Sequence, residues 1–248
     1  MQNLKISLIT VAFNAQNTIA KCLESVKGQT FSNIQHIVVD GGSTDGTLQI
    51  LEKYSENIAI LISGPDRGIY DAMNKGIKMA TGDIIGTLNA DDYLADDQAI
   101  SDVAEAFATQ NINILYGDLD FIDLNGLIVR KWRSGIYRRG LCNWGWMPPH
   151  PTFYCKRELF ERLGSYKLDY GSAADYELMI RFIHLNKIDA FHLDKVIIKM
   201  LVGGVSNKSL VNRVKASGFD LKAMRSNGIK FPLMTLVMKP LRKIMQFF

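Results

Sequence analysis

Residues 83–92 read DIIGTLNADD, an apolar run that ends in two adjacent carboxylates. Such a run is typical of a strand buried on both faces. Two neighbouring acids repel each other unless a positive charge lies close by. A divalent cation that carries a diphosphate meets this need, because it prefers hard oxygen ligands. An isolated acidic pair at a strand end is weak evidence, since most such pairs are solvated, so the rest of the chain has to support it.

The first hundred residues alternate predicted strands and helices. Continuous apolar runs predict strands at residues 6–13, 34–39, 58–62 and 83–88. Helical spacing of apolar residues predicts helices at residues 17–29, 45–54 and 70–80. This order predicts an α/β fold with a parallel sheet and right-handed crossovers. Ligands in such sheets bind outside the carboxyl ends of the strands, where we expect Asn14, Asp40, Asp91 and Asp92.

The regular alternation of predicted strands and helices ends after residue 97. Strands are predicted at residues 114–118, 127–132 and 196–202, with helices at 98–107, 160–163, 174–185 and 207–227. The loop over residues 133–151 is rich in Gly, Trp and Pro and, with the residue before it, holds all three tryptophans, Trp132, Trp144 and Trp146. A long aromatic loop beside a site is more often functional than decorative. Trp146 is therefore a candidate contact for an acceptor or a phosphate.

Composition places the chain among globular proteins, with 47% hydrophobic and 22% charged residues. The three cysteines, Cys22, Cys142 and Cys155, show no CxxC spacing and fit a reducing compartment. No uncharged apolar run approaches the roughly 20 residues that span a bilayer. We therefore expect a cytoplasmic protein, with any membrane contact peripheral and at the inner face.

Basic residues gather at the C-terminus. From Lys199 onward there are ten Lys and Arg and one acid, Asp220, in a chain of net charge +4. This asymmetry predicts an anionic partner, either nucleic acid or a membrane. Residues 231–248 read FPLMTLVMKPLRKIMQFF, which mixes apolar and cationic side chains as interfacial helices do. An anionic membrane is thus favoured over nucleic acid, with packing of the tail on the core an equally weighted alternative.

Residues 40–47 read DGGSTDGT and follow a predicted strand. The carboxylate of Asp40 is suited to accept hydrogen bonds from a base such as uracil, and Gly41 permits close approach of a ligand. Asn14 and Ser43 lie beside it in the predicted fold. The spacing differs from the GxGxxG dinucleotide fingerprint. Taken alone, the stretch fits a strand-to-helix loop with an N-cap better than it fits a binding site.

Residues 66–76 read DRGIYDAMNKG, and Asp71, Asn74 and Lys75 fall at helical offsets. Arg67 and Lys75 could balance the charge of a diphosphate. The alternative is an exposed, capped helix with ordinary surface charges.

Asp175 begins a predicted helix beside the small residues 171–174. An Asp at this position is usually a cap or a partner of the helix dipole, but it could also act as a general base that reaches into a cleft. His150, within Pro148–Pro151, is a candidate acceptor or phosphate contact, with a structural role equally weighted. The remaining histidines lie within apolar elements and are interpreted as structural: His36, His184 and His192.

Taken together, these motifs resemble glycosyltransferase family 2, whose members are inverting and nucleotide-sugar-dependent. The resemblance covers about residues 4–206 and rests on residues 11–14, 40–47, 66–76, 89–92 and 174–177. It implies a GT-A-type nucleotide-binding fold, with a mostly parallel central sheet flanked by helices, here followed by a C-terminal helical tail.

The resemblance also implies roles for individual residues. Asp92 would bind Mg²⁺ or Mn²⁺, and Asp175 would be the catalytic base. The backbone near Val11 and Phe13 would hold the base together with Asp40, and Asp91 would meet the ribose. The predicted nucleotide-sugar site comprises Val11, Phe13, Asn14, Asp40, Gly41, Ser43, Asp66, Arg67, Asp71, Asn74, Lys75 and Asp91.

Two positions depart from the family pattern. Ala15 replaces a frequent Glu, and Ala174 replaces a common acid before the base; neither change removes a catalytic group, but they leave the subgroup open. The QxxRW motif of processive synthases is absent, which predicts transfer of a single sugar.

The predicted partners are a nucleoside-diphosphate sugar, with UDP favoured, and a carbohydrate or lipid-linked acceptor in surface polysaccharide assembly. Residues 1–206 would form the catalytic domain, with a donor half at 1–97 and an acceptor half at 98–206, and residues 207–248 a basic extension. The sequence indicates no oligomeric state. Two other classes stay open from the residues, a nucleotidyltransferase and a non-catalytic nucleotide-sugar-binding protein.

Overall fold

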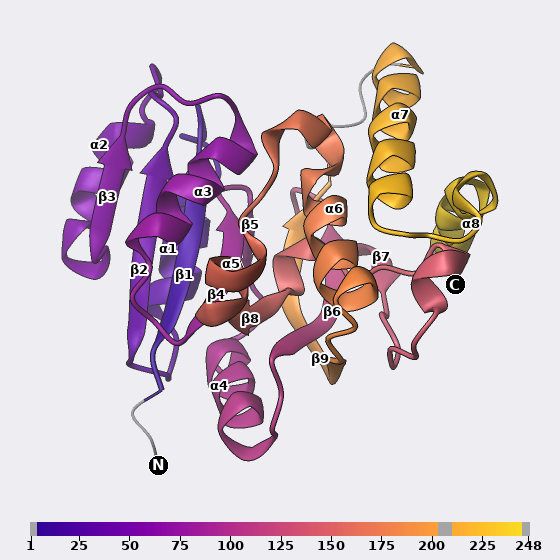
Figure 1. The fold of residues 1–248 in the computed structure, drawn as a ribbon. Helices are drawn as coiled ribbons and strands as arrows, with labels where there is room; N and C mark the ends of the chain where they lie inside the picture. Colours follow the sequence, from indigo (N-terminus) through magenta and orange to yellow (C-terminus); the bar gives the residue numbers. More distant parts are fainter. Residues whose placement is uncertain (1–3, 203–209, 245–248) are drawn as a thin grey trace.

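The computed structural model describes residues 4–202 and 210–244, which form one mixed sheet with helices on both faces (Figure 1). The sheet has nine strands, in the order β3-β2-β1-β4-β8-β6-β9-β5, and β7 pairs with β6. The indigo N-terminal strands and the yellow C-terminal helices lie on opposite sides of the molecule in Figure 1. The predicted α/β class is confirmed.

The parallel half of the sheet comes from the N-terminal part of the chain. Its strands are β1 (Ile6–Ala12), β2 (Ile34–Asp40), β3 (Ile60–Ser63) and β4 (Ile84–Asn89). In register, Ile6 of β1 lies between Ile34 of β2 and Ile84 of β4. Every residue of β1 is buried, because the strand is covered on both faces and flanked on both edges. The continuous apolar run at the start of the chain therefore indicated a central strand correctly.

Helices cover both faces of the sheet. On one face α1 (Ile19–Lys27), α2 (Thr47–Lys53) and α4 (Ala99–Thr109) share an apolar cluster with the strands. On the other face the cluster includes α3 (Ile69–Met79), α5 (Arg157–Leu163) and α6 (Ala174–Ile180). A single-turn helix, η1 (Ser55–Asn57), follows α2. The second face carries α6, whose second residue is the candidate base Asp175.

The second half of the sheet is mixed. It contains β5 (Asp92–Leu94), β6 (Ile114–Ile122), β7 (Ile128–Trp132), β8 (Tyr154–Lys156) and β9 (Ala190–Leu201). β8 runs antiparallel to both β4 and β6, whereas β6 and β9 are parallel. β5 and β8 were not predicted, because three residues are too few to show an alternation. β9 begins at residue 190, six residues before the predicted start.

Two helices close the described chain, α7 (Leu210–Ser226) and α8 (Pro232–Ile244). Three contacts fix α8 to the body of the protein. The hydroxyl of Thr235 donates to the carbonyl of Asn143 at 2.6 Å, and Lys239 pairs with Asp220 of α7 at 2.8 Å. A Cβ on Gly145 would lie 2.6 Å from the backbone nitrogen of Lys239, so the two backbones touch. One face of the basic tail therefore packs on the protein.

The opposite face of α8 is open. Its exposed apolar residues, with the residue before the helix, are Phe231, Leu233, Met234, Val237 and Leu241. None of the helices in the described ranges combines the length and the apolar character needed to cross a bilayer. Residues 207–209 of the predicted basic helix, residues 245–248 of the tail and the predicted boundary at 206–207 lie outside the described residues.

Candidate active site

The carboxyl ends of three parallel strands lie side by side. Ala12 of β1 is in register with Asp40 of β2, and Val11 is in register with Asn89 of β4. The chain leaves these strands into the three motif loops, so the sheet brings the Asn14, Asp40 and Asp91–Asp92 segments to one edge, as the strand order predicted.

Asp40 organises its own loop. It is fully buried, and its Oδ2 accepts hydrogen bonds from the backbone N–H of Gly42 at 3.1 Å and of Ser43 at 3.0 Å. The hydroxyl of Ser63 donates to the same oxygen at 2.7 Å, and that of Ser43 donates to Oδ1. Gly42 has a φ of +84°, which favours glycine. The carboxylate thus holds the loop in shape from behind, with the loop backbone facing outward.

A second set of contacts ties this loop to the end of β1. The backbone N–H of Asn14 donates to the hydroxyl of Ser43 at 2.8 Å, and the Asn14 side chain accepts from the N–H of Thr44 at 2.9 Å. Phe13, before Asn14, is 65% exposed. A Cβ on Gly41 would lie 2.7 Å from Asp66 Oδ2 and 3.4 Å from the Phe13 ring. An open aromatic ring and a carboxylate therefore flank a bare stretch of backbone, which suits a flat ligand.

The Asp66–Gly76 segment satisfies most of its own polar groups. Asp66 accepts from the N–H of Gly68 at 2.8 Å, and Arg67 forms an ion pair with Asp71 at 2.8 Å. Lys75 donates to the carbonyl of Pro65 at 2.9 Å. The Arg67 side chain is nevertheless 77% exposed, so its guanidinium is the accessible cation of this segment.

Asn74 acts as a tie between distant segments. Its amide donates to the carbonyl of Tyr166 at 2.8 Å and accepts from the N–H of Tyr166 at 3.0 Å. Both polar groups of the side chain are thereby occupied in holding Tyr166 against α3. Its predicted contact with the nucleotide sugar stays a prediction, and the geometry gives it a positioning role.

The two adjacent acids differ in their surroundings. Asp91 is partly buried, whereas Asp92 begins β5 and is only 1% exposed. Burial raises the pKa of Asp92 well above its usual range, and the charge of Asp91 adds to this. The side chain of Asn89 donates to Asp92 Oδ2 at 2.9 Å. Asp92 Oδ1 and Asn89 Oδ1 are buried and have no hydrogen-bond donor in the described part of the chain.

These oxygens fit a divalent cation. Mg²⁺ and Mn²⁺ prefer hard oxygen ligands, and the end of β4 presents two unsatisfied oxygens beside a partly exposed carboxylate. A nearby cation would also favour the ionised form of Asp92, which burial disfavours. The residues present are therefore compatible with a metal at the Asp91–Asp92 pair.

A second cluster of metal-ligand types lies farther along the sheet. Asp118 of β6 and His192 and Asp194 of β9 place one ligand atom each within 4.8 Å of one another. Asp118 already accepts from the N–H of Ser134 at 2.9 Å and contacts His192 at 3.0 Å, and Arg133 lies 3.7 Å away. The guanidinium supplies the positive charge that a metal would bring. Sequence reasoning missed this cluster, although Asp118 and Asp120 alternate with apolar residues along β6.

Asp175 lies among aromatic side chains. It stands near the start of α6, and its Oδ1 accepts from the N–H of Tyr176 at 2.7 Å. Its charge acts on the nearby side chains of Tyr70 and His150. Burial raises the pKa of Tyr70, and Asp175 raises it further. Burial lowers the pKa of His150, and Asp175 opposes that shift. Burial therefore favours the neutral form of His150.

His150 and Tyr166 complete this group. The Nε2 of His150 lies 2.7 Å from the Tyr166 hydroxyl, and both residues are buried. The residues come from α3, from η3 (His150–Thr152), from the segment after α5 and from α6. The fold therefore brings His150 and Asp175 close to each other. Both were predicted from the sequence to belong to the reactive site. Tyr70 and Tyr166 were not singled out as site residues from the sequence.

A buried ion pair fixes the helix that carries Asp175. Glu177 is fully buried and pairs with Arg181 at 3.0 Å and with Lys167 at 3.0 Å. Arg181 opens the π-helix η5 (Arg181–Leu185) and also donates to the backbone carbonyls of residues 163–165. η4 (Leu168–Ala173) leads directly into α6. Asp175 therefore projects from a rigid element.

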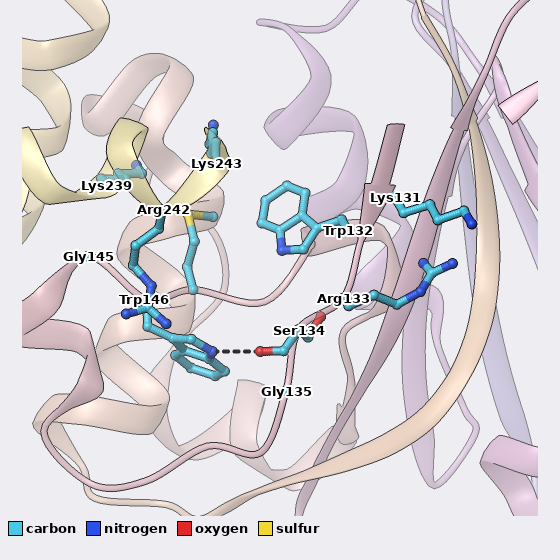
Figure 2. A pocket seen from close by; sticks show the side chains of 11 residues that line it. Lys131, Trp132, Arg133, Ser134, Gly135, Gly145, Trp146, Lys239, Arg242 and Lys243 are labelled. Carbon is cyan, nitrogen blue, oxygen red and sulfur yellow. Dashed lines mark hydrogen bonds between the residues drawn. The ribbon is translucent and has the colours of Figure 1, made fainter. Parts of the chain in front are cut away.

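Trp146 is buried and forms part of the wall of a cleft. It is 4% exposed, and its indole N–H donates to the carbonyl of Ser134 at 3.0 Å (Figure 2). Its ring packs against Tyr116 and Tyr137, with centroids 5.3 Å and 4.8 Å apart. It also lines a cleft of about 520 Å³ that extends to α8. A direct acceptor contact for Trp146 stays a prediction, limited by this burial to the edge of its ring.

Comparisons with known proteins identify the class to which this fold and site belong. Residues 7–165 match the family described as Glycosyl transferase family 2. A PGL/p-HBAD biosynthesis glycosyltransferase of Mycobacterium bovis is 32% identical over 186 residues, which cover 71% of this chain and 68% of that protein. The chain belongs to glycosyltransferase family 2.

Solved structures show the same GT-A fold. TarS of S. aureus matches with a TM-score of 0.70 at 21% identity, over 90% of this chain and 39% of that one. Residues 1–349 of TarS in complex with UDP give a TM-score of 0.70 at 20% identity, over 96% and 71%. The mannosyltransferase PcManGT of Pyrobaculum calidifontis, in complex with GDP-Man and Mn2+, gives 0.68 at 17% identity, over 95% and 72%.

Proposed function

We propose that this enzyme transfers one sugar, with inversion, from a nucleoside-diphosphate sugar to an acceptor hydroxyl. The observation that carries the proposal is the pair of unsatisfied oxygens on Asn89 and Asp92, at the carboxyl edge of the parallel sheet. This edge is where α/β sheets bind nucleotides. The family membership separates the proposal from a nucleotidyltransferase.

The donor would lie across the ends of β1, β2 and β4. Phe13 and the backbone at Gly41 offer a flat surface for the base, and UDP is favoured since TarS structures contain UDP and UDP-GlcNAc. Asp92 would hold Mg²⁺ or Mn²⁺, which would supply positive charge to the leaving diphosphate, and Asp91 would meet the ribose. Arg67, 77% exposed, is placed to add a further positive charge.

Asp175 would accept the proton of the attacking hydroxyl. Its carboxylate is partly exposed, and the buried ion pair between Glu177, two residues farther along α6, and Arg181 limits the motion of the helix. The hydroxyl of Tyr70, which lies near Asp175, can orient the acceptor by a hydrogen bond, and the hydrogen bond between His150 and Tyr166 fixes the wall behind it. A rigid base beside an acceptor pocket gives the alignment that displacement needs.

The acceptor would be presented at the inner face of the cytoplasmic membrane, on a lipid carrier used in surface polysaccharide assembly. The exposed apolar face of α8 and the excess of basic residues after position 199 support docking on an anionic leaflet. The three cysteines are free and buried, which agrees with a reducing compartment.

A donor screen tests the proposed reaction. The purified chain is incubated with UDP-, GDP- and dTDP-sugars and Mn²⁺ or Mg²⁺, and release of nucleoside diphosphate is measured. We expect slow release from one donor or a few related donors, because water replaces the acceptor. No release from any donor with either metal would contradict the proposal and favour a binding protein without activity.

A further inference from the structure

A cleft of about 520 Å³ separates α8 from the strand β7 and the residues that follow it (Figure 2). Its lining is strongly basic. Lys239, Arg242 and Lys243 line it from α8, and Lys131 and Arg133 line it from the other side. These residues lie more than a hundred positions apart in the sequence, so the fold has gathered them.

The positive charge of the cleft exceeds its negative charge. Lys239 is neutralised by Asp220 at 2.8 Å, and Arg133 by Asp120 at 2.7 Å. Lys131, Arg242 and Lys243 form no ion pair with any carboxylate of the described residues. Within residues 4–202 and 210–244, these three cations of the cleft are therefore without an ion-pair partner.

The pKa of Lys243 reflects the cations gathered around it. Burial lowers its pKa, the charges of Lys239 and Arg130 lower it further, and the charges of Asp220 and Asp175 only partly oppose these shifts. Its ammonium lies 5.8 Å from the centroid of the Trp132 ring, an aromatic contact that favours a cation without neutralising it. A bound anion would relieve the repulsion among these groups.

The cleft adjoins the proposed base. The ammonium of Lys239 lies 3.7 Å from the centroid of the Tyr176 ring, and Tyr176 directly follows Asp175. The charge of Asp175 also acts on Lys243. An anionic group in the cleft would thus lie beside the place where the acceptor hydroxyl has to be.

The cleft also adjoins the open face of α8. Leu233, Val237 and Leu241 are exposed on the helix whose Arg242 and Lys243 line the cleft. A molecule with a lipid tail at this face could therefore place a polar head group among the cations. Phosphate and diphosphate groups are the usual partners of such Lys and Arg clusters.

We propose that this cleft binds a phosphate or diphosphate group on the acceptor, next to the sugar whose hydroxyl Asp175 deprotonates. The inference rests on the proposed glycosyl transfer and names the class of its acceptor. Recognition of the anion is direct, through Lys131, Arg242 and Lys243, without a metal ion.

Binding of two probes tests the proposal, with the full-length chain in low salt and excess chelator. Inorganic diphosphate tests the anion alone, and farnesyl diphosphate tests the same anion on a prenyl tail. Titration calorimetry measures both. Chelator removes the metal that the donor site needs, so diphosphate bound there does not contribute.

The test variant is Arg242→Ala with Lys243→Ala, and Lys131→Ala probes the opposite wall. The matched control is Lys53→Ala with Arg162→Ala, two exposed cations outside the cleft. We expect the double cleft variant to weaken binding of both probes at least tenfold and Lys131→Ala to weaken it severalfold. The control should stay within twofold, and circular dichroism should show that all variants are folded.

The outcomes separate cleanly. Tighter binding of the prenyl probe assigns the acceptor to a lipid carrier, and equal binding assigns it to a soluble phosphorylated saccharide; both support the cleft as the anion site. Equal affinity of the wild type and the double cleft variant, or no binding of either probe, overturns the inference. Failure of the proposed function shows separately, as absence of nucleotide release by the wild type in the donor screen.

Discussion

The two halves of this enzyme place opposite charges where phosphate would bind. In the donor half, the carboxyl edge of the parallel sheet presents the acids Asp91 and Asp92. In the rest of the chain, the cleft between β7 of the predicted acceptor half and α8 of the C-terminal extension presents Lys131, Arg242 and Lys243. An acidic site can bind a diphosphate only through a metal ion, whereas a basic site binds it directly. The proposed reaction uses both modes, one for the leaving group and one for the acceptor.

The two halves also differ in construction. The donor half is regular: four parallel strands end at one edge, and the Asp40 loop is held by hydrogen bonds to its own backbone. The acceptor half combines parallel and antiparallel strands with short helices and long loops. A regular scaffold suits a ligand shared by a whole family, and a loop-rich one suits an acceptor that varies.

The largest effect is expected from the proposed metal site at the carboxyl edge of the parallel sheet. Asp92→Asn should reduce transfer to below about 1% of wild type, because a metal contributes several kcal/mol to stabilisation of the leaving diphosphate. Since Asp92 is 1% exposed and its pKa is raised by burial, the neutral Asn should not lower the melting temperature measured in chelator. Turnover and thermal melting of purified protein check both parts.

Chelator provides the matching control on the wild type. It should silence transfer while leaving diphosphate binding in the basic cleft intact, which would sharpen the contrast between the two halves. Full activity in excess chelator would remove the metal from the mechanism and, with it, the contrast.

The second effect concerns the base in the acceptor half. Asp175→Asn should lower the turnover of bound donor and acceptor by roughly a hundredfold or more, as loss of general-base assistance does. Affinity for the nucleoside diphosphate, measured by calorimetry, should change little, since the proposed donor site is at the strand ends. Collapse of donor affinity with normal turnover would instead make Asp175 a binding or structural residue.

The sequence predicted the donor half well for a physical reason. Strands buried on both faces are continuous apolar runs, so β1, β2 and β4 can be recognised in the amino-acid sequence. Their order implies that their carboxyl ends lie at the same edge of the sheet. The residues alone did not distinguish Asp91 from Asp92, whose separate roles came from the family resemblance; in the structure, the start of β5 buries Asp92 and leaves Asp91 partly exposed.

The acceptor half was less predictable because its site is assembled over long distances. Tyr70, His150 and Asp175 come from three separate segments, and only packing brings them together. The basic cleft joins residues near 131 to residues near 242. The basic composition of the tail was evident, but which of its cations face a cleft depends on how α8 packs against Gly145 and Asn143.

The smallest effect concerns the open face of α8 and tests whether apolar contact and anion binding are separate functions of one helix. Leu233→Ser, Val237→Ser and Leu241→Ser together should weaken binding to anionic liposomes about tenfold or more, since each side chain contributes apolar burial at the interface. These residues are exposed, so folding should be unaffected. Release of nucleotide from the donor should persist, because these three side chains are exposed on α8 and none of them belongs to the proposed donor site. Deleting residues 231–248 should weaken liposome binding further, since it also removes Lys239, Arg242 and Lys243.

Equal liposome binding by wild type and both variants at low salt would show that α8 only packs on the protein. The acceptor would then have to reach the basic cleft from solution.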